Sequence, residues 1–181
     1  MKPLIVLVFL FCAVSSHAAP RPPSPPPETE HFAPLLGSWL VSGRSLSPDG
    51  QTWKENPHPA LWTFYGILND HGIQDDWTSP APHIAVAEAT RTYGTNIRIF
   101  NNTERRWEMA WIDSTNQLVR SFTATSSIDQ IIMNSVGRTP PRRNIFYEMT
   151  SEGFRWRQEW TFDEGKTWVP VSYLEATAWQ R

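Results

Sequence analysis

Several arginines of this chain lie within apolar segments, where a charged side chain would matter most: Arg98, Arg120, Arg142 and Arg143. A guanidinium that faces an apolar interior has to be paired, because an unpaired buried charge is costly. Asp75, Glu108 and Glu159 are the simplest partners. The alternative is that each arginine points into solvent, as most charged side chains do. The residues alone leave both interpretations open.

A buried carboxylate could also move a proton, since burial raises the pKa of an acid, and Asp75 and Glu159 are the candidates for that role. Other chemistries lack the residues they need. The only cysteine is Cys12, and there is no Gly-x-Ser-x-Gly turn or glycine-rich phosphate loop. The histidines that follow residue 19 are not spaced as metal ligands usually are: His31, His58, His71 and His83. We therefore expect no metal and no cofactor.

The charge balance and the aromatic content narrow the class of partner. The 181 residues carry 16 basic and 18 acidic side chains, a formal charge of −2, which argues against a nucleic-acid partner. Ten tryptophans exceed what a core of this size needs. Aromatic side chains offer a large apolar surface, and ligand sites are lined mainly by such side chains together with a few polar groups. The composition therefore favours a small apolar or aromatic molecule as the partner.

The first residues are typical of a secretory signal peptide. Lys2 precedes an apolar run over residues 4–14, and small residues follow up to Ala19. The run is shorter than the roughly 20 residues of a membrane-spanning helix. We expect cleavage of residues 1–19, a secreted or periplasmic location and no membrane span. Residues 20–31 are rich in proline, which predicts an extended, stiff spacer.

From Phe32 onward the chain is predicted to be all-β, because short β-branched and aromatic runs alternate with turn signals. Strands are expected at Gly37–Gly43, Ala60–Leu68, Gly72–Trp77, Thr95–Asn101, Arg106–Asp113, Gln117–Ser126, Asp129–Val136, Asn144–Thr150, Gly153–Phe162 and Thr167–Ala178. One short helix-like stretch covers Pro82–Arg91. Ten strands with short connections fit an antiparallel up-and-down β-barrel, or a sandwich. We expect a single barrel domain over residues 32–181.

Alternation within two of these strands indicates which side chains face the interior. In the predicted strand Arg106–Asp113, one face is apolar, with Trp107, Met109 and Trp111, and the opposite face carries Arg106 and Glu108. The predicted strand Gly153–Phe162 has Phe154, Trp156 and Trp160 on one face. Its other face carries Arg155, Arg157 and Glu159. Strands with one aromatic and one charged face are expected in a sheet that closes around an apolar interior.

Two segments with similar spacing, Ser47–Trp53 and Thr161–Trp168, match or nearly match the Asp-box hairpin. In such a turn the aspartate accepts hydrogen bonds from turn amides and the glycine takes positive φ. We interpret both as structural turns with no catalytic role.

The order Gly37-Ser38-Trp39 at the start of the first strand resembles the lipocalin signature. This resemblance implies that Trp39 closes the barrel floor beneath Arg181 from the last strand. Over nearly the whole domain the chain is also similar to the lipocalin-like, calycin-type family of unknown function usually labelled DUF1579. The matching blocks are residues 66–77, 93–100, Arg106, Trp107 and Trp111, residues 154–159, residues 163–168 and Arg181. That family implies a barrel and no settled reaction, and it favours inward positions for Arg98, Asp75 and Glu159.

Our leading hypothesis is an exported barrel that binds a small apolar or aromatic molecule. We predict that four tryptophans share one wall of the cavity, with an arginine and two acids as polar anchors: Trp77, Trp107, Trp111 and Trp156, with Arg98, Asp75 and Glu159. The bland alternative is that the same tryptophans simply fill the interior. A second hypothesis is a lyase, isomerase or cyclase that uses an interior acid, and a third is a structural protein of the cell envelope.

Overall fold

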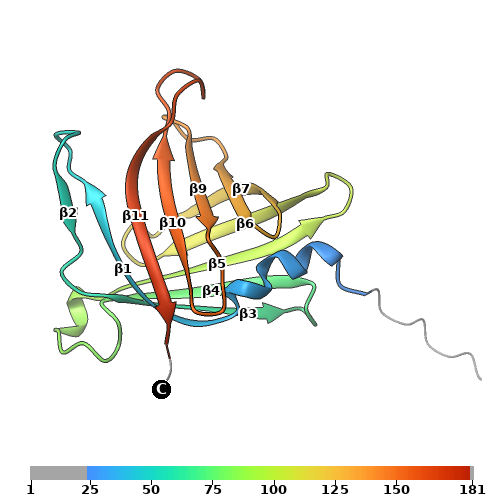
Figure 1. The fold of residues 1–181 in the computed structure, drawn as a ribbon, viewed down its shortest axis with the longest axis horizontal. Coiled ribbons are helices and arrows are strands. Elements are labelled where there is room, and N and C mark those ends of the chain that lie inside the picture. The colour runs from blue at the N-terminus through green and yellow to red at the C-terminus, as the bar shows by residue number, and fades with distance from the viewer. Residues whose placement is uncertain (1–23, 180–181) are drawn as a thin grey trace, which may run out of the picture.

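The computed structural model describes residues 24–179, and these form an antiparallel barrel with little helix (Figure 1). The signal peptide expected over residues 1–19 and the terminal Arg181 lie outside the described residues. The strands are β1 (Gly37–Leu46), β2 (Trp53–Glu55), β3 (Ala60–Ile67), β4 (Gly72–Ser79), β5 (Thr92–Asn101), β6 (Arg106–Asp113), β7 (Val119–Ser126), β8 (Gln130–Ser135), β9 (Arg142–Tyr147), β10 (Gly153–Trp160) and β11 (Val169–Ala178).

Ten of these strands close into a ring. From β3 to β11 each strand pairs with the next along the chain, β1 pairs with β3, and β11 returns to pair with β1. At the closure Trp39 lies opposite Ala178, and all pairings are antiparallel. The short β2 pairs with the end of β1 outside the ring. This confirms the up-and-down, lipocalin-like barrel expected from the sequence.

The strand predictions are correct for all ten strands of the ring, and the bounds of β6 are those expected. β2 was not expected, because three residues are too few to show an alternation. The expected helix over Pro82–Arg91 is wrong except for one short turn, η2 (Glu88–Thr90). This loop is instead held by the guanidinium of Arg91, which donates to the carbonyl oxygens of Pro80 and Ile84, both at 2.6 Å.

The proline-rich segment does not stay extended up to residue 31. A 3₁₀ helix, η1 (Pro27–Leu35), begins within the expected spacer, and the side chains of Phe32 and Leu35 are fully buried. Proline is tolerated in the first helical turn, where its missing N–H has no partner to lose. Composition alone favoured an extended chain, but burial of two large apolar side chains stabilises the helix.

The helix η1 packs against one end of the barrel (Figure 1). The ring of Phe32 lies edge-on to Trp107 at 4.7 Å, and His31 Nδ1 is 2.8 Å from Ser126 Oγ. Ser126 is the last residue of β7 and Trp107 is the second residue of β6, so the helix covers the end of the barrel at which β7 ends and β6 begins.

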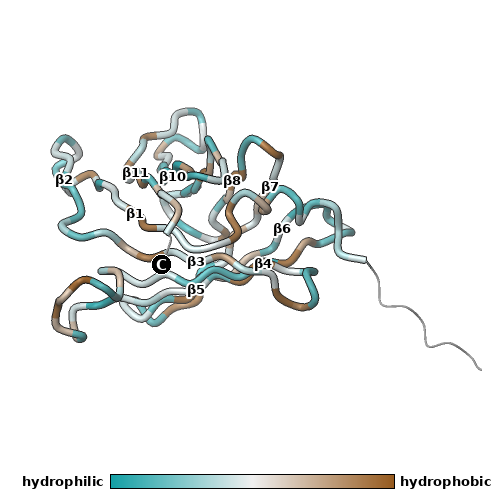
Figure 2. Tube along the Cα trace, turned by 60° about the horizontal axis from the view of Figure 1, so that its bottom comes forward, coloured by the Kyte–Doolittle hydropathy of each residue, from teal (hydrophilic) through white to brown (hydrophobic). Residues whose placement is uncertain are grey.

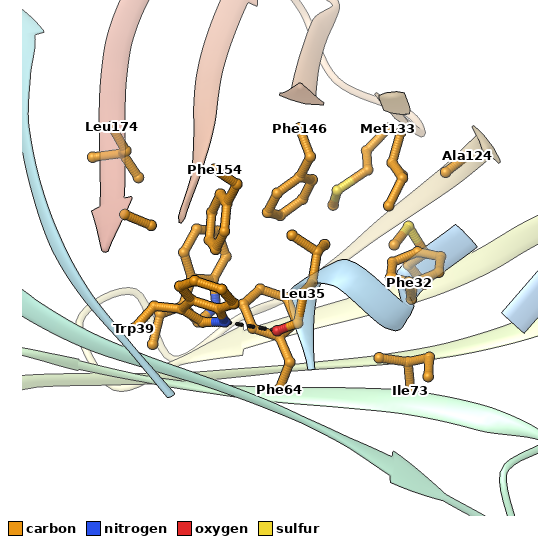
Figure 3. Packing of buried hydrophobic residues seen from close by; sticks show 14 of the residues in the cluster. Phe32, Leu35, Trp39, Phe64, Ile73, Ala124, Met133, Phe146, Phe154 and Leu174 are labelled. Atoms are coloured by element: carbon orange, nitrogen blue, oxygen red, sulfur yellow. Dashed lines mark hydrogen bonds between the residues drawn. The ribbon is translucent and has the colours of Figure 1, made fainter. Parts of the chain in front are cut away.

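The core lies between this helix and the strands (Figure 3). Trp39 is 3% exposed and its indole Nε1 donates to the carbonyl oxygen of Leu35 at 2.7 Å, so Trp39 joins the first strand to η1. The expected contact between Trp39 and Arg181 lies outside the described residues. Figure 2 shows hydrophilic and hydrophobic residues interspersed along the strands of the barrel.

Both Asp-box-like segments form turns stabilised by their aspartate. Asp49 Oδ1 accepts from the backbone N–H groups of Gln51 and Thr52, each at 2.9 Å. Asp163 Oδ1 accepts from the backbone N–H of Thr167 at 2.9 Å. Hydrogen bonds to the ionised form lower the pKa of each aspartate to about 2, with the threonine side chain the largest cause. Both segments therefore form the aspartate-stabilised turns that the sequence predicts.

Candidate functional site

The barrel encloses a cavity of about 260 Å³ at the end opposite η1. Its described lining has four tryptophans (Trp62, Trp77, Trp111, Trp156), four other apolar residues (Phe122, Met133, Phe146, Leu174), four neutral polar residues (Asn96, Ser135, Asn144, Gln158) and four arginines (Arg98, Arg120, Arg138, Arg142). The volume lies just below the roughly 300–1,000 Å³ typical of ligand sites, so a small molecule would fit it.

Four of the seven residues predicted to bind a ligand line this cavity: Trp77, Trp111, Trp156 and Arg98. The other three, Trp107, Asp75 and Glu159, do not.

The four predicted tryptophans do not share one wall. β6, with Trp111, pairs with β5 and β7, whereas β10, with Trp156, pairs with β9 and β11. The two strands therefore face each other across the barrel. Trp107 is fully buried at the closed end, where it contacts Phe32 and Phe100. Trp107 therefore belongs to the core. For this one tryptophan the alternative hypothesis, that the tryptophans fill the interior, is correct.

The position of Trp111 depends on a small residue on the neighbouring strand. An added Cβ at Gly94 would lie 2.3 Å from Trp111 Cη2, so only glycine allows the indole to lie across β5. The indole Nε1 also donates to Asp113 Oδ2 at 3.0 Å. These contacts hold Trp111 in the cavity wall.

Asp75 and Arg98 form an ion pair in which both side chains are fully buried. The register of β4 against β5 places Ile73 opposite Arg98 and Asp75 opposite Asn96, so the pair is diagonal. Trp62 Nε1 also donates to Asp75 Oδ1 at 2.7 Å. Burial raises the pKa of Asp75, while Arg98 and Trp62 act in the opposite direction. The predicted inward positions of both residues are correct, but Asp75 stands behind Arg98.

The guanidinium of Arg98 has N–H donors that its contacts in the protein leave without an acceptor. This guanidinium lies over the rings of Phe32 and Phe64, with ring centroids 5.6 and 5.5 Å from Cζ. Arg98 Nε and Nη1 have no hydrogen-bond partner in the described part of the chain, and neither does the nearby Asn96 Oδ1. Buried polar atoms of this kind usually find a partner, in protein, water or ligand.

Glu159 belongs to the outer face of the barrel. Because Trp156 and Gln158 line the cavity, alternation directs Arg157 and Glu159 away from it. Arg157 Nε donates to Glu159 at 2.7 Å, and Arg143 pairs with the other carboxylate oxygen. Burial alone would raise the pKa of Glu159, but the bonds from the two arginines outweigh it and hold the pKa below its usual value. The prediction that Glu159 anchors a ligand in the cavity is therefore wrong, because its side chain faces away from the cavity and pairs with two arginines.

The mouth of the cavity, defined by Arg120, Arg138 and Arg142, is more exposed than its inner end. Arg120 Nη1 donates to Asp113 Oδ2 at 2.8 Å and its side chain is 22% exposed, against 0% for the side chain of Arg98. Arg142 lies over the ring of Trp160 at 4.2 Å. The sequence had marked Arg120 and Arg142 as candidates for pairing in the interior, and both lie in the lining.

Some lining residues were missed by sequence reasoning. Trp62 alternates with Phe64 in the strand over 60–67, so the period-two pattern could have placed it inside. Arg138 lies in the turn after β8, and nothing in its local sequence marks it. Asn144 and Gln158, which bond to each other at 3.0 Å, carry no signal because amides occur on both faces of strands.

The lining offers cations, amides and apolar surface, and no carboxylate among the residues described. Such a set can hold a molecule and orient its acceptors. The two acids named as possible proton donors, Asp75 and Glu159, are both paired and stand outside it. No group of three or more potential metal ligands occurs within residues 24–179.

Neither helix described for residues 24–179 is long and apolar enough to cross a membrane.

Comparisons with known proteins support the fold. No family model matches the chain, so membership of the family labelled DUF1579 is not confirmed, and no curated protein matches it. Among solved structures, the chain is similar to an S-type phycobiliprotein lyase, CPES, from Guillardia theta, with a TM-score of 0.50 and 11% identity. The match covers 84% of this chain and 92% of that one. At this identity the likeness shows a shared barrel fold alone.

Proposed function

We propose that this protein binds a small aromatic or apolar molecule inside the barrel. The observation that carries this function is the cavity of about 260 Å³, lined by Trp62, Trp77, Trp111 and Trp156. A core that only fills space would have no need of the buried guanidinium of Arg98, whose Nε and Nη1 lack hydrogen-bond partners among residues 24–179. Barrels with an apolar interior and a few polar groups are common sites for small ligands.

Titration with neutral aromatic compounds, among them naphthalene carboxamide, tests this function. Binding beside the cavity tryptophans is expected to quench tryptophan emission saturably and to raise the melting temperature. The substitution Trp156→Ala is expected to weaken binding by more than about 1 kcal/mol, the usual mark of an anchor residue.

Trp53→Ala is the matched control, because Trp53 of β2 lies outside the cavity lining, where it packs against Tyr173 of β11 and Arg44 of β1. It also removes one indole and is expected to leave the affinity unchanged. If neutral and charged aromatic compounds all leave emission and melting temperature unchanged, the cavity is a packing gap and this function is wrong.

We also propose that the chain is exported with removal of residues 1–19, as their charged start, apolar run and small residues indicate. Mass measurement of the protein from its native host is expected to give a chain that starts at Pro20. A chain that keeps Met1 or Lys2 would contradict export by this route. Membership of the DUF1579 family stays a proposal based on the blocks that resemble it.

A further inference from the structure

Positive charge exceeds negative charge at the mouth of the cavity. Three guanidinium groups line it, those of Arg120, Arg138 and Arg142, and Asp113 pairs with the first of them. Among residues 24–179 no carboxylate forms an ion pair with Arg138 or Arg142. Burial, followed by the charges of Arg138 and Arg120, lowers the pKa of Arg142. These cations are therefore close enough to repel one another.

Cations held together without an acid partner are typical of anion sites. A guanidinium presents its N–H groups in a planar fork that matches a carboxylate, and such charge-assisted bonds are about twice as strong as neutral ones. The guanidinium of Arg142 lies over the ring of Trp160 at 4.2 Å, so the indole covers one of its two faces. Arg142 Nε has no hydrogen-bond partner among the described residues.

The inner end of the cavity has a different character. Arg98 is 1% exposed and lines the cavity, and its charge is compensated by Asp75. Its unpartnered Nε and Nη1 therefore suit a neutral acceptor, such as a carbonyl or hydroxyl oxygen, better than a second anion. The cavity is thus neutral at its inner end and positive at its mouth.

We infer that the ligand is an aromatic acid, with a compact carboxylate held by Arg138 and Arg142 at the mouth and its ring system lying between Trp111 and Trp156. This assignment rests on the proposed function, since it names the chemical class of the molecule bound in the same cavity. Arg120 takes part less, because Asp113 already accepts from it.

Naphthalene carboxylate and naphthalene carboxamide form the test pair, because they differ in charge and hardly in shape. Affinities are measured by quenching of tryptophan emission and by calorimetry. The carboxylate is expected to bind the native protein at least about ten-fold more tightly than the amide, a difference of about 1.4 kcal/mol that charge-assisted hydrogen bonds can supply. Arg138→Gln and Arg142→Gln are each expected to remove most of this preference, because each weakens binding of the carboxylate much more than binding of the amide.

Arg155→Gln is the control, since Arg155 is exposed and pairs with Glu148 and Glu175 on the outer face. The Arg138→Gln variant is expected to fold like the native protein, because Arg138 lies in a turn and makes no ion pair within residues 24–179. A loss of preference in this variant therefore does not result from misfolding. Equal binding of carboxylate and amide would overturn the acid assignment while the cavity function stands. A preference that survives in both Arg138→Gln and Arg142→Gln would overturn it too. If neither probe binds, the proposed function itself fails.

Discussion

Removal of Arg98 is the sharpest test of how the interior is stabilised. The side chains of Arg98 and Asp75 are both 0% exposed, so Arg98→Met leaves a carboxylate buried without its cation. Breaking a buried pair in this way costs about 3–5 kcal/mol. For a domain of this size each kcal/mol corresponds to roughly 2–4 °C, so the melting temperature is expected to fall by about 6–20 °C.

A second substitution is expected to restore most of the loss. In Arg98→Met with Asp75→Asn no charge remains, and the side-chain oxygen of the asparagine can still accept from Trp62 Nε1, which now bonds to Asp75 at 2.7 Å. Replacing both members of a buried pair is often neutral or stabilising. We therefore expect the double variant to lie within about 1–2 kcal/mol of the native protein, which a double-mutant cycle by denaturant unfolding measures.

The pH dependence gives an independent check. Burial raises the pKa of Asp75 already in the native protein, and without Arg98 the pKa rises further. A raised pKa means that the folded state binds the proton more tightly, so stability is gained as pH falls through the folded pKa toward the unfolded value of about 3.9. Arg98→Met is expected to regain stability on acidification, whereas the double variant is not. If Arg98→Met is as stable as the native protein at neutral pH, the buried pair is not formed.

Two further predictions concern the closed end and a turn. Trp39→Ala is expected to destabilise by about 3–5 kcal/mol in denaturant unfolding, because a 3% exposed indole and its bond to Leu35 are lost; an unchanged midpoint would show that Trp39 is exposed. Asp163 has a pKa of about 2, so its turn contributes stability above the unfolded pKa of about 3.9 that is lost as pH falls toward 2. Asp163→Asn is expected to flatten the stability profile in this range, and an unaltered acid profile would argue against the turn's hydrogen bonds.

Much of the barrel is determined locally and could be predicted from the sequence. Alternation with period two belongs to each strand, so the ten strands of the ring, and the inward direction of Trp77, Trp111 and Trp156, follow from neighbouring residues alone. The same rule places Glu159 outside. The family resemblance suggested an inward anchor there, and the local pattern proved the better guide.

The helix η1 shows where local reasoning ends. The prolines before residue 28 indicated an extended chain, and the helix forms because Phe32 and Leu35 are buried against distant strands. Composition carries no information about that contact, since Phe32 meets Trp107, 75 positions along the chain. Tertiary burial decided the local conformation here, as it often does for weak helices.

The sequence by itself determined the strands, their faces, the tight turns and the kinds of side chain available to a ligand. Only the tertiary structure decided which of these side chains meet. Closure of β11 on β1 brings Trp156 across from Trp111, and the register of β4 on β5 pairs Asp75 with Arg98. The mouth of the cavity likewise combines Arg120, Arg138 and Arg142 from two strands and a turn. Alternation repeats every two residues within a strand, whereas closure and register depend on contacts between segments far apart in the chain, which no local pattern encodes.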